Sequence, residues 1–123
     1  SLITLMSGLP NLDRPRALAM AEAGAGRGAE AQFELIVTLI DLFLARLARA
    51  GTLGQLPHEA ADGEAALITR LSPSPHHARA WADLAQHLGL RARRGKAVNL
   101  DPAALLMDMV LQTNTMAGML AQR

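Results

Sequence analysis

The sequence predicts an all-α fold, a single bundle of about five to six helices, and three observations support this prediction. Half of the 123 residues are hydrophobic, mainly alanine and leucine, whereas aromatic residues make up only 2%. Apolar residues recur at helical spacing in several runs, which short clusters of glycine and proline separate. No run alternates apolar and polar side chains with β-branched enrichment, so we expect no strand.

Two helices are predicted at the start of the chain. A short apolar stripe over residues 2–9 is closed by Pro10. Asp13 then offers an N-cap, and Pro15 stands in the first turn of the next helix, where its missing N–H is not needed. The glycine-rich run 24–28 ends this second helix. It is interpreted as a flexible connector, because its spacing differs from that of dinucleotide-binding loops and no strand precedes it.

The longest helical pattern runs from Ala29 to Ala50, and Gly51 follows it in the position that ends many helices. Residues 51–62 are expected to form a loop. The core-facing positions of the helix recur at helical spacing and are Phe33, Ile36, Val37, Ile40, Phe43, Leu44 and Leu47. A second face is filled by Leu35, Leu39 and Leu42, so this helix has more apolar surface than one core requires.

A brief helix fits residues 64–71. After it, Ser74 and Pro75 repeat the combination of an N-cap with proline at the first helical position. The helix that they open either frays near Gly89 or continues to Arg94.

The last helix is predicted from Ala103 to about Leu120. Asp101 is its N-cap, Pro102 takes the first helical position, and Asn99, in the turn before them, is a further predicted cap residue. Its apolar surface is too broad for a helix with one neighbour, so we expect neighbours from this domain, from a second protein, or from both. The stripe consists of Leu105, Leu106, Met109, Val110, Met116 and Leu120, and Met107 and Leu111 widen it.

Composition excludes several classes of protein. Lys and Arg number 12 against 11 for Asp and Glu, so no global charge draws the chain to nucleic acid or to an anionic membrane. The absence of cysteine excludes disulfides and thiolate metal sites and fits a cytoplasmic location. The densest apolar run, residues 33–44, is shorter than the roughly 20 residues of a membrane span. Because the chain begins at Ser1 with an apolar stripe under way, residues 1–123 are interpreted as one domain of a longer protein.

The sequence contains no convincing catalytic, metal or cofactor motif. The segment Gly89–Lys96 reads G-x5-G-K, whereas a phosphate-binding loop has closer glycines, a Ser or Thr after the lysine, and a preceding strand. The histidines are His58, His76, His77 and His87. The adjacent pair would point about 100° apart on a helix, which disfavours binding of one metal ion. We therefore expect no catalytic residue, no metal, no cofactor and no small-molecule ligand.

A basic segment before the last helix contains Arg91, Arg93, Arg94 and Lys96. Such cations are favoured at the C-terminal end of a helix by its dipole, without any ligand. Contact with the phosphates of a nucleic acid is the functional alternative, but the aromatic residues that stack on bases are nearly absent. Direct DNA contact by this domain is therefore disfavoured. Trp81 is interpreted as a core residue or an interface anchor.

The order of segments carries a resemblance to a known family. A helix containing Ala80-Trp81-Ala82-Asp83-Leu84 precedes the basic segment, and Ala97-Val98-Asn99-Leu100-Asp101-Pro102 opens the leucine-rich last helix. Upstream lie Leu9-Pro10-Asn11-Leu12-Asp13-Arg14 and Leu44-Ala45-Arg46-Leu47-Ala48-Arg49-Ala50. These segments resemble the C-terminal domain of the delta-prime subunits of bacterial DNA polymerase III, in the versions found in alpha-proteobacteria. The likeness spans nearly the whole chain, and Asn99-Leu100-Asp101 is its most specific part.

The resemblance implies a helical collar domain of the sliding-clamp loader, which acts in DNA replication. In that family the delta-prime subunit joins the delta subunit and the tau or gamma subunits in a five-membered ring. The C-terminal domains pack side by side and hold the ring together. The ATPase-like module lies N-terminal to the collar, so the resemblance places no catalytic residue in this chain.

The expected partner surface includes Trp81, Leu106, Met109 and Val110. Two other classes of protein remain open. An effector-binding or dimerisation domain of a helical transcription regulator would have a ligand pocket inside the bundle and a two-fold interface. A small helical enzyme would need histidines that converge on a cavity.

Overall fold

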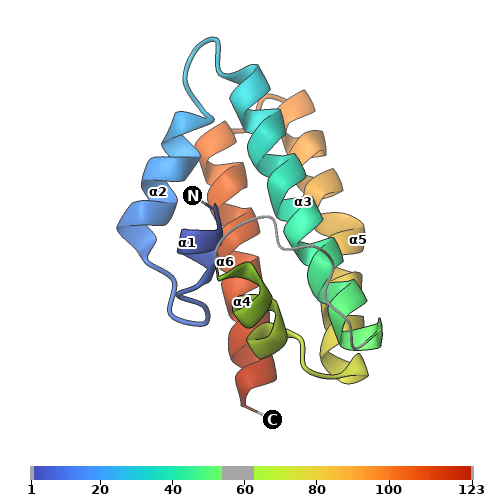
Figure 1. Cartoon of the computed structure of the whole chain (residues 1–123). Helices are drawn as coiled ribbons and strands as arrows, with labels where there is room; N and C mark the ends of the chain where they lie inside the picture. Colours follow the sequence, from blue (N-terminus) through green and yellow to red (C-terminus); the bar gives the residue numbers. More distant parts are fainter. Residues whose placement is uncertain (1, 54–62, 123) are drawn as a thin grey trace.

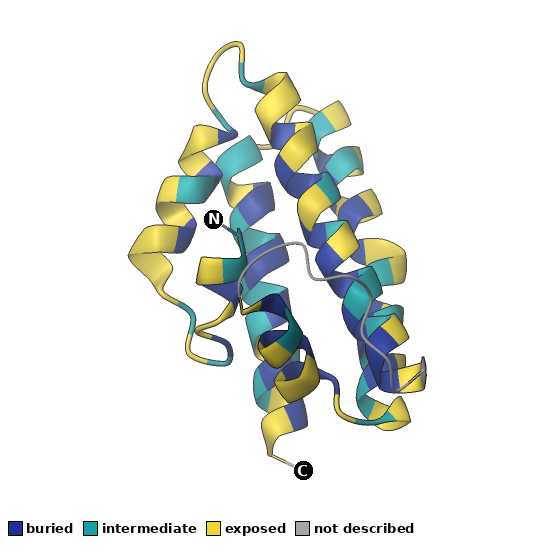
Figure 2. Cartoon of the chain, in the orientation of Figure 1, coloured by how far each residue is buried: buried dark blue, intermediate teal, exposed yellow. Residues whose placement is uncertain are grey.

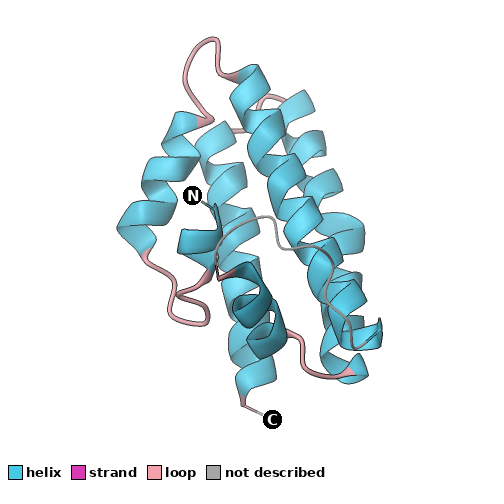
Figure 3. Ribbon diagram, viewed as in Figure 1, coloured by secondary structure: helices cyan, strands magenta, loops and turns pink. Residues whose placement is uncertain are grey.

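Six helices pack around one apolar core in the part of the chain that the computed structural model describes, residues 2–53 and 63–122 (Figure 1). Within these residues there is no strand, and the predicted all-α fold is confirmed (Figure 3). In chain order the helices are α1 (Leu2–Met6), α2 (Arg14–Ala23), α3 (Glu30–Leu53), α4 (Glu64–Leu71), α5 (Pro75–Ala97) and α6 (Pro102–Ala121).

The helix α6 lies at the centre of the bundle and packs against α2, α3 and α5 (Figure 1). The most extensive pairing is between α3 and α5, and α4 packs on α3. The expectation that the last helix needs neighbours on more than one side is confirmed, and helices of the same chain provide them. Among the described helices, none is long and apolar enough to cross a membrane.

The predicted N-caps are confirmed. The side chains of Asp13 and Ser74 each accept a hydrogen bond from the backbone N–H three residues further on, at 3.2 and 3.4 Å. Asp101 accepts one from the N–H two residues on, at 3.2 Å. Pro75 and Pro102 occupy the first turns of α5 and α6. Each cap satisfies a backbone donor that a helix start leaves without an internal partner, and this local chemistry determines where these helices begin.

The sequence predicted that α3 ends at Gly51, but the helix continues to Leu53. A β-carbon at Gly51 would lie only 2.6 Å from Ser72 Oγ and from the carbonyl oxygen of Ser74. The glycine therefore permits close packing of α3 against the α4–α5 connection instead of ending the helix. The loop predicted for residues 51–62 is wrong for 51–53, and residues 54–62 lie outside the described part of the chain.

The helix α5 does not fray at Gly89, but continues past it to Ala97. A β-carbon at Gly89 would lie 2.5 Å from Asp41 Oδ1, so this glycine leaves room for the Asp41 side chain of α3 against α5. Its low intrinsic helix propensity is outweighed by the packing that its missing side chain permits.

Asn99 ends α5 instead of capping the following helix. It adopts a left-handed conformation, with φ of 65°. Its N–H donates to the carbonyl of Lys96 at 3.1 Å, and the N–H of Leu100 donates to the carbonyl of Gly95 at 2.9 Å. This pair of bonds is a Schellman motif, for which asparagine is a common substitute for glycine.

Candidate partner-binding surface

The four residues predicted to form the partner surface are buried inside the chain's own core. Trp81, Leu106, Met109 and Val110 each have 0% exposure. The indole Nε1 of Trp81 also donates a hydrogen bond to the carbonyl of Leu71 at 2.9 Å. Side chains without exposed surface cannot contact a partner while the fold is intact, so this prediction is wrong. Helical spacing identified apolar faces, but it could not tell which face the chain's other helices would cover.

A different apolar surface is exposed on α3. Leu35, Leu39 and Leu42 are 50%, 41% and 54% exposed, and together they are called the leucine face. The core-facing side of the same helix is almost completely buried, and Figure 2 shows exposed positions along much of α3. The predicted second apolar face of this helix is confirmed. Three half-exposed leucines on one helix face form a contiguous patch of the kind that marks interaction sites, unlike leucines that are scattered singly.

A recess lies beside the leucine face, between α3 and the first two helices. Its volume is about 260 Å³. Because α2 packs mainly on α6, the space between α2 and α3 stays open. The recess is smaller than the roughly 300–1,000 Å³ of typical small-molecule sites. It is lined by Leu2, Leu5, Arg16, Met20, Gln32, Ile36 and Leu39 and is called the α2–α3 recess.

A second exposed apolar area lies where α5 turns into α6. Val98 and Leu100 are 68% and 54% exposed, and this area is called the α5–α6 corner. An open depression of about 630 Å³ adjoins it, with Arg91 and Arg94 among its lining residues. The Schellman turn holds the corner in a defined shape, so its apolar side chains have fixed positions on the surface.

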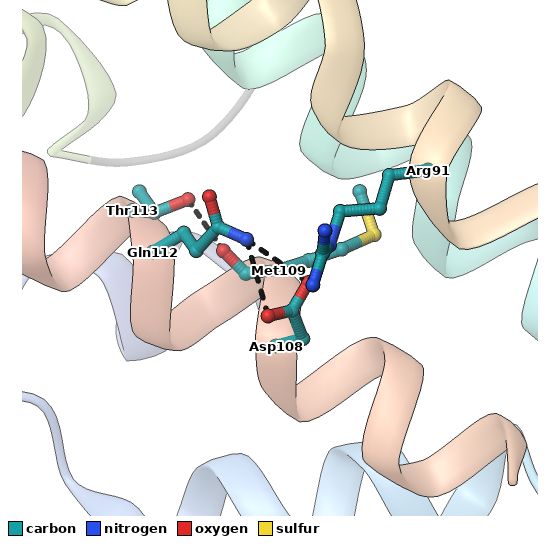
Figure 4. Close-up of polar contacts among 5 residues, drawn as sticks. All are labelled: Arg91, Asp108, Met109, Gln112 and Thr113. Carbon is teal, nitrogen blue, oxygen red and sulfur yellow. Dashed lines mark hydrogen bonds and ion pairs between the residues drawn. The ribbon is translucent and has the colours of Figure 1, made fainter. Parts of the chain in front are cut away.

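The first cation of the basic segment is held by α6. Arg91 Nε contacts Asp108 Oδ2 at 2.9 Å (Figure 4). Gln112 Nε2 donates to both oxygens of the same carboxylate at 3.1 Å. The Arg91 side chain remains 62% exposed, so this pair contributes little to stability, but it does orient the guanidinium across the corner.

Arg93 is paired within the fold. Its Nε contacts Glu34 Oε1 at 2.7 Å and its Nη1 contacts Asp41 Oδ2 at 3.1 Å. Its Nη2 donates a hydrogen bond to Thr38 Oγ1 at 3.4 Å. The hydrogen bond to Glu34 is the main cause of a raised pKa for the Arg93 guanidinium, with Asp41 adding to it and burial opposing it. Phosphate contact by Arg93 would require breaking two ion pairs, which argues against the predicted role.

The remaining cations of the segment point to different neighbours. Lys96 Nζ lies 5.9 Å from the centre of the Phe33 ring, in the range of a cation–π contact. Arg94 is exposed and lines the depression at the α5–α6 corner. The basic segment therefore does not present its four cations as one patch. Phosphate contact stays an untested prediction for Arg91, Arg94 and Lys96.

The histidines form no metal site among the described residues, which contain no group of three potential ligands. The rings of His76 and His77 lie edge to face, 5.8 Å apart. His77 Nδ1 is 2.6 Å from the Oγ of Ser74, so this histidine belongs to the N-cap of α5. His58 lies outside the described part of the chain.

Three polar contacts that the sequence did not reveal hold the N-terminal segment and α4 in place. Arg70 Nη1 donates to the carbonyl of Leu9 at 2.7 Å, and Asn114 Oδ1 accepts from the N–H of Leu12 at 3.2 Å. Arg46 pairs with the buried carboxylate of Glu64. The first two contacts join residues that are 61 and 102 positions apart, so no local pattern could have indicated them. They fix the turn between α1 and α2, and residues of these two helices form one wall of the α2–α3 recess.

Comparison with protein-family models, with curated proteins and with solved structures finds no match to this chain.

Proposed function

We propose that this chain is a subunit-assembly domain, the helical collar of a clamp-loader subunit of the delta-prime type. In this role it joins the delta subunit and the tau or gamma subunits and holds the loader together while sliding clamps are placed on DNA. The chain itself breaks no bonds and needs no cofactor. Catalysis belongs to other parts of such a loader.

The observation that carries the proposal is the leucine face. Leu35, Leu39 and Leu42 leave about half of their surface in water on the longest helix of the bundle. Apolar area of this kind gains free energy when a partner covers it, at about 25 cal/mol per Å². A ring subunit uses such area for lateral contact.

The α5–α6 corner gives a second, separate surface. It contains the Asn99-Leu100-Asp101 segment on which the sequence resemblance depends most. Its apolar side chains come from the end of α5 and from the turn, whereas the leucine face lies on α3. A subunit within a ring has two neighbours that it meets through different surfaces, so two exposed apolar areas suit this role.

The proposal is tested by assembly of the full chain with purified tau or gamma and delta subunits, followed by size-exclusion chromatography. The test variant is Leu35→Gln/Leu39→Gln/Leu42→Gln, because glutamine keeps a helix propensity close to that of leucine. The control is Met119→Gln, which removes an exposed apolar residue of α6 that is 55% exposed. We expect the triple variant to lose assembly and the control to retain it.

Circular dichroism of both variants checks that their helices remain intact. Assembly of the folded triple variant at the wild-type level would contradict the role of the leucine face. Failure of the wild-type chain to bind any of these subunits would overturn the clamp-loader assignment itself.

A further inference from the structure

The spacing of the leucine face is that of a helix-binding seam. Leu35, Leu39 and Leu42 follow one another at steps of four and three residues. Apolar residues at this spacing form the contact line between two helices in coiled coils. In α3 this line is separate from the side that faces the core, so it is available to a helix from outside the bundle.

The neighbours of the seam on one side are small. Ala31 and Ala45 lie four and three positions from its leucines and therefore adjoin them on the helix surface, whereas Thr38 between them is contacted by Arg93. Small side chains beside a seam allow the axes of two helices to approach closely, because the distance between packed helices depends on the side chains at the contact. On its other side, the seam borders the α2–α3 recess through Leu39, which also lines that recess.

The charged side chain that lines the recess is a cation. Its polar lining consists of Arg16 and Gln32, and none of the described residues that line it is acidic. The side chain of Arg16 is 56% exposed, and its contact with Asp13 is long, at 3.7 Å. The guanidinium therefore keeps donors for a partner. The exposed Arg49, one heptad beyond Leu42, lies on the other flank of α3, where it lines a groove against α5.

We propose that the leucine face and the α2–α3 recess together bind an amphipathic helix of a partner protein, with acidic side chains flanking its apolar seam. An apolar side chain of that helix enters the recess beside Leu39, and a carboxylate pairs with Arg16. This is helix-in-groove recognition, in which apolar anchors at i, i+3, i+4 and i+7 supply affinity and charges select the partner. The inference rests on the proposed assembly function and names the chemistry of the partner at one of its surfaces.

The test uses two synthetic helical peptides of about 21 residues, three heptads with leucine at both seam positions. One carries glutamate at the flanking positions and the other carries lysine. Fluorescence anisotropy with the full chain is expected to give at least about tenfold tighter binding of the glutamate peptide at low salt, because like charges across an interface disfavour the wrong partner. Leu39→Gln should weaken binding of both peptides, whereas Met119→Gln should leave both unchanged.

A charge-reversal variant makes the test specific. Arg16 is the third residue of α2, where an acidic side chain is favoured by the helix dipole, so Arg16→Glu should fold normally. In this variant the lysine peptide should become the tighter ligand. Equal binding of the two peptides by the wild-type chain, or a preference that Arg16→Glu does not change, would overturn the charge assignment.

Other outcomes separate this inference from the proposed function. If neither peptide binds more tightly than about 1 mM, the helix is not the occupant, even if the leucine variants still abolish assembly with loader subunits. If sedimentation shows a dimer of the wild-type chain that Leu39→Gln dissociates, a second copy is the occupant and the inference is wrong. If the glutamate peptide binds as expected but no loader subunit does, the binding surface stands and the clamp-loader assignment fails.

Discussion

Two sides of α3 face away from the core, and they differ in whether other residues of the chain contact their side chains. The side towards α5 is polar, and its Glu34, Thr38 and Asp41 all contact Arg93 of the same chain. The leucine face, on the other hand, remains about half exposed. Glu34 and Asp41 of this helix are thus paired internally, whereas its leucine face lacks cover.

This difference shows which residues of the chain are available to a partner. In most surface helices, charged residues meet water and leucines are covered. Here the conspicuous basic segment is largely occupied within the fold, so charge alone points to the wrong functional region. The leucine face is the more informative feature, since exposed apolar residues that adjoin one another mark interaction surfaces more reliably than cations at a helix end.

The largest expected effect on stability lies in the core, to which the buried side of α3 belongs. Trp81→Ala should lower the free energy of unfolding by about 3–5 kcal/mol, because it leaves a large cavity and an unpaired carbonyl at Leu71. Urea denaturation followed by circular dichroism measures the loss. A change below about 1 kcal/mol would contradict the burial of this side chain and would indicate that Trp81 lies at the surface.

A smaller effect is expected where the polar side of α3 meets α5. Gly89→Ala places a β-carbon against the Asp41 carboxylate and should destabilise the fold by about 1–3 kcal/mol. Asp41→Ala removes the obstructing group, so the double variant should lose less than the sum of the two single variants. A double-mutant cycle in urea measures this coupling. Strict additivity would show that the two residues do not touch.

Loss of the Arg93 pairs should have a modest effect that depends on salt. Arg93→Gln is expected to cost about 0.5–1 kcal/mol at low ionic strength, because the side chain is 37% exposed and solvent screens its ion pairs. Since the folded-state pKa of Arg93 is raised, its contribution is complete below the unfolded-state pKa and is lost only as pH rises through the folded-state value. Both values lie above the range of about pH 5 to 9, where the contribution of Arg93 protonation to stability should stay flat. Urea melts at several pH values and salt concentrations test this.

The smallest effect on stability per substituted residue is expected at the leucine face itself. Leu35→Gln/Leu39→Gln/Leu42→Gln should change the free energy of unfolding by only about 0.5 kcal/mol per site, because these side chains are already half exposed. Thermal denaturation of the isolated chain measures it. A large loss of stability would mean that the leucines pack within the fold and are not free for a partner. The two sides of α3 would then not differ in whether the chain itself covers them.

Local signals in the sequence predicted the helix starts well. Asp13, Ser74 and Asp101 cap helices as expected, because capping and the restricted backbone of proline act within a few residues. Predictions of helix ends were weaker. Gly51 was predicted to end its helix, and Gly89 left open whether its helix frays or continues. Both lie inside helices, because each lets a distant part of the chain approach more closely than a side chain would permit.

The sequence alone determined that the chain is helical and that α3 and α6 have more than one apolar face, because helical periodicity is a property of neighbouring residues. Only the tertiary structure decided which of those faces are covered. It buried Trp81 and Met109 and left Leu39 at the surface. Burial depends on which helices pack together, and this choice results from contacts between residues far apart in the chain, on which local spacing carries no information.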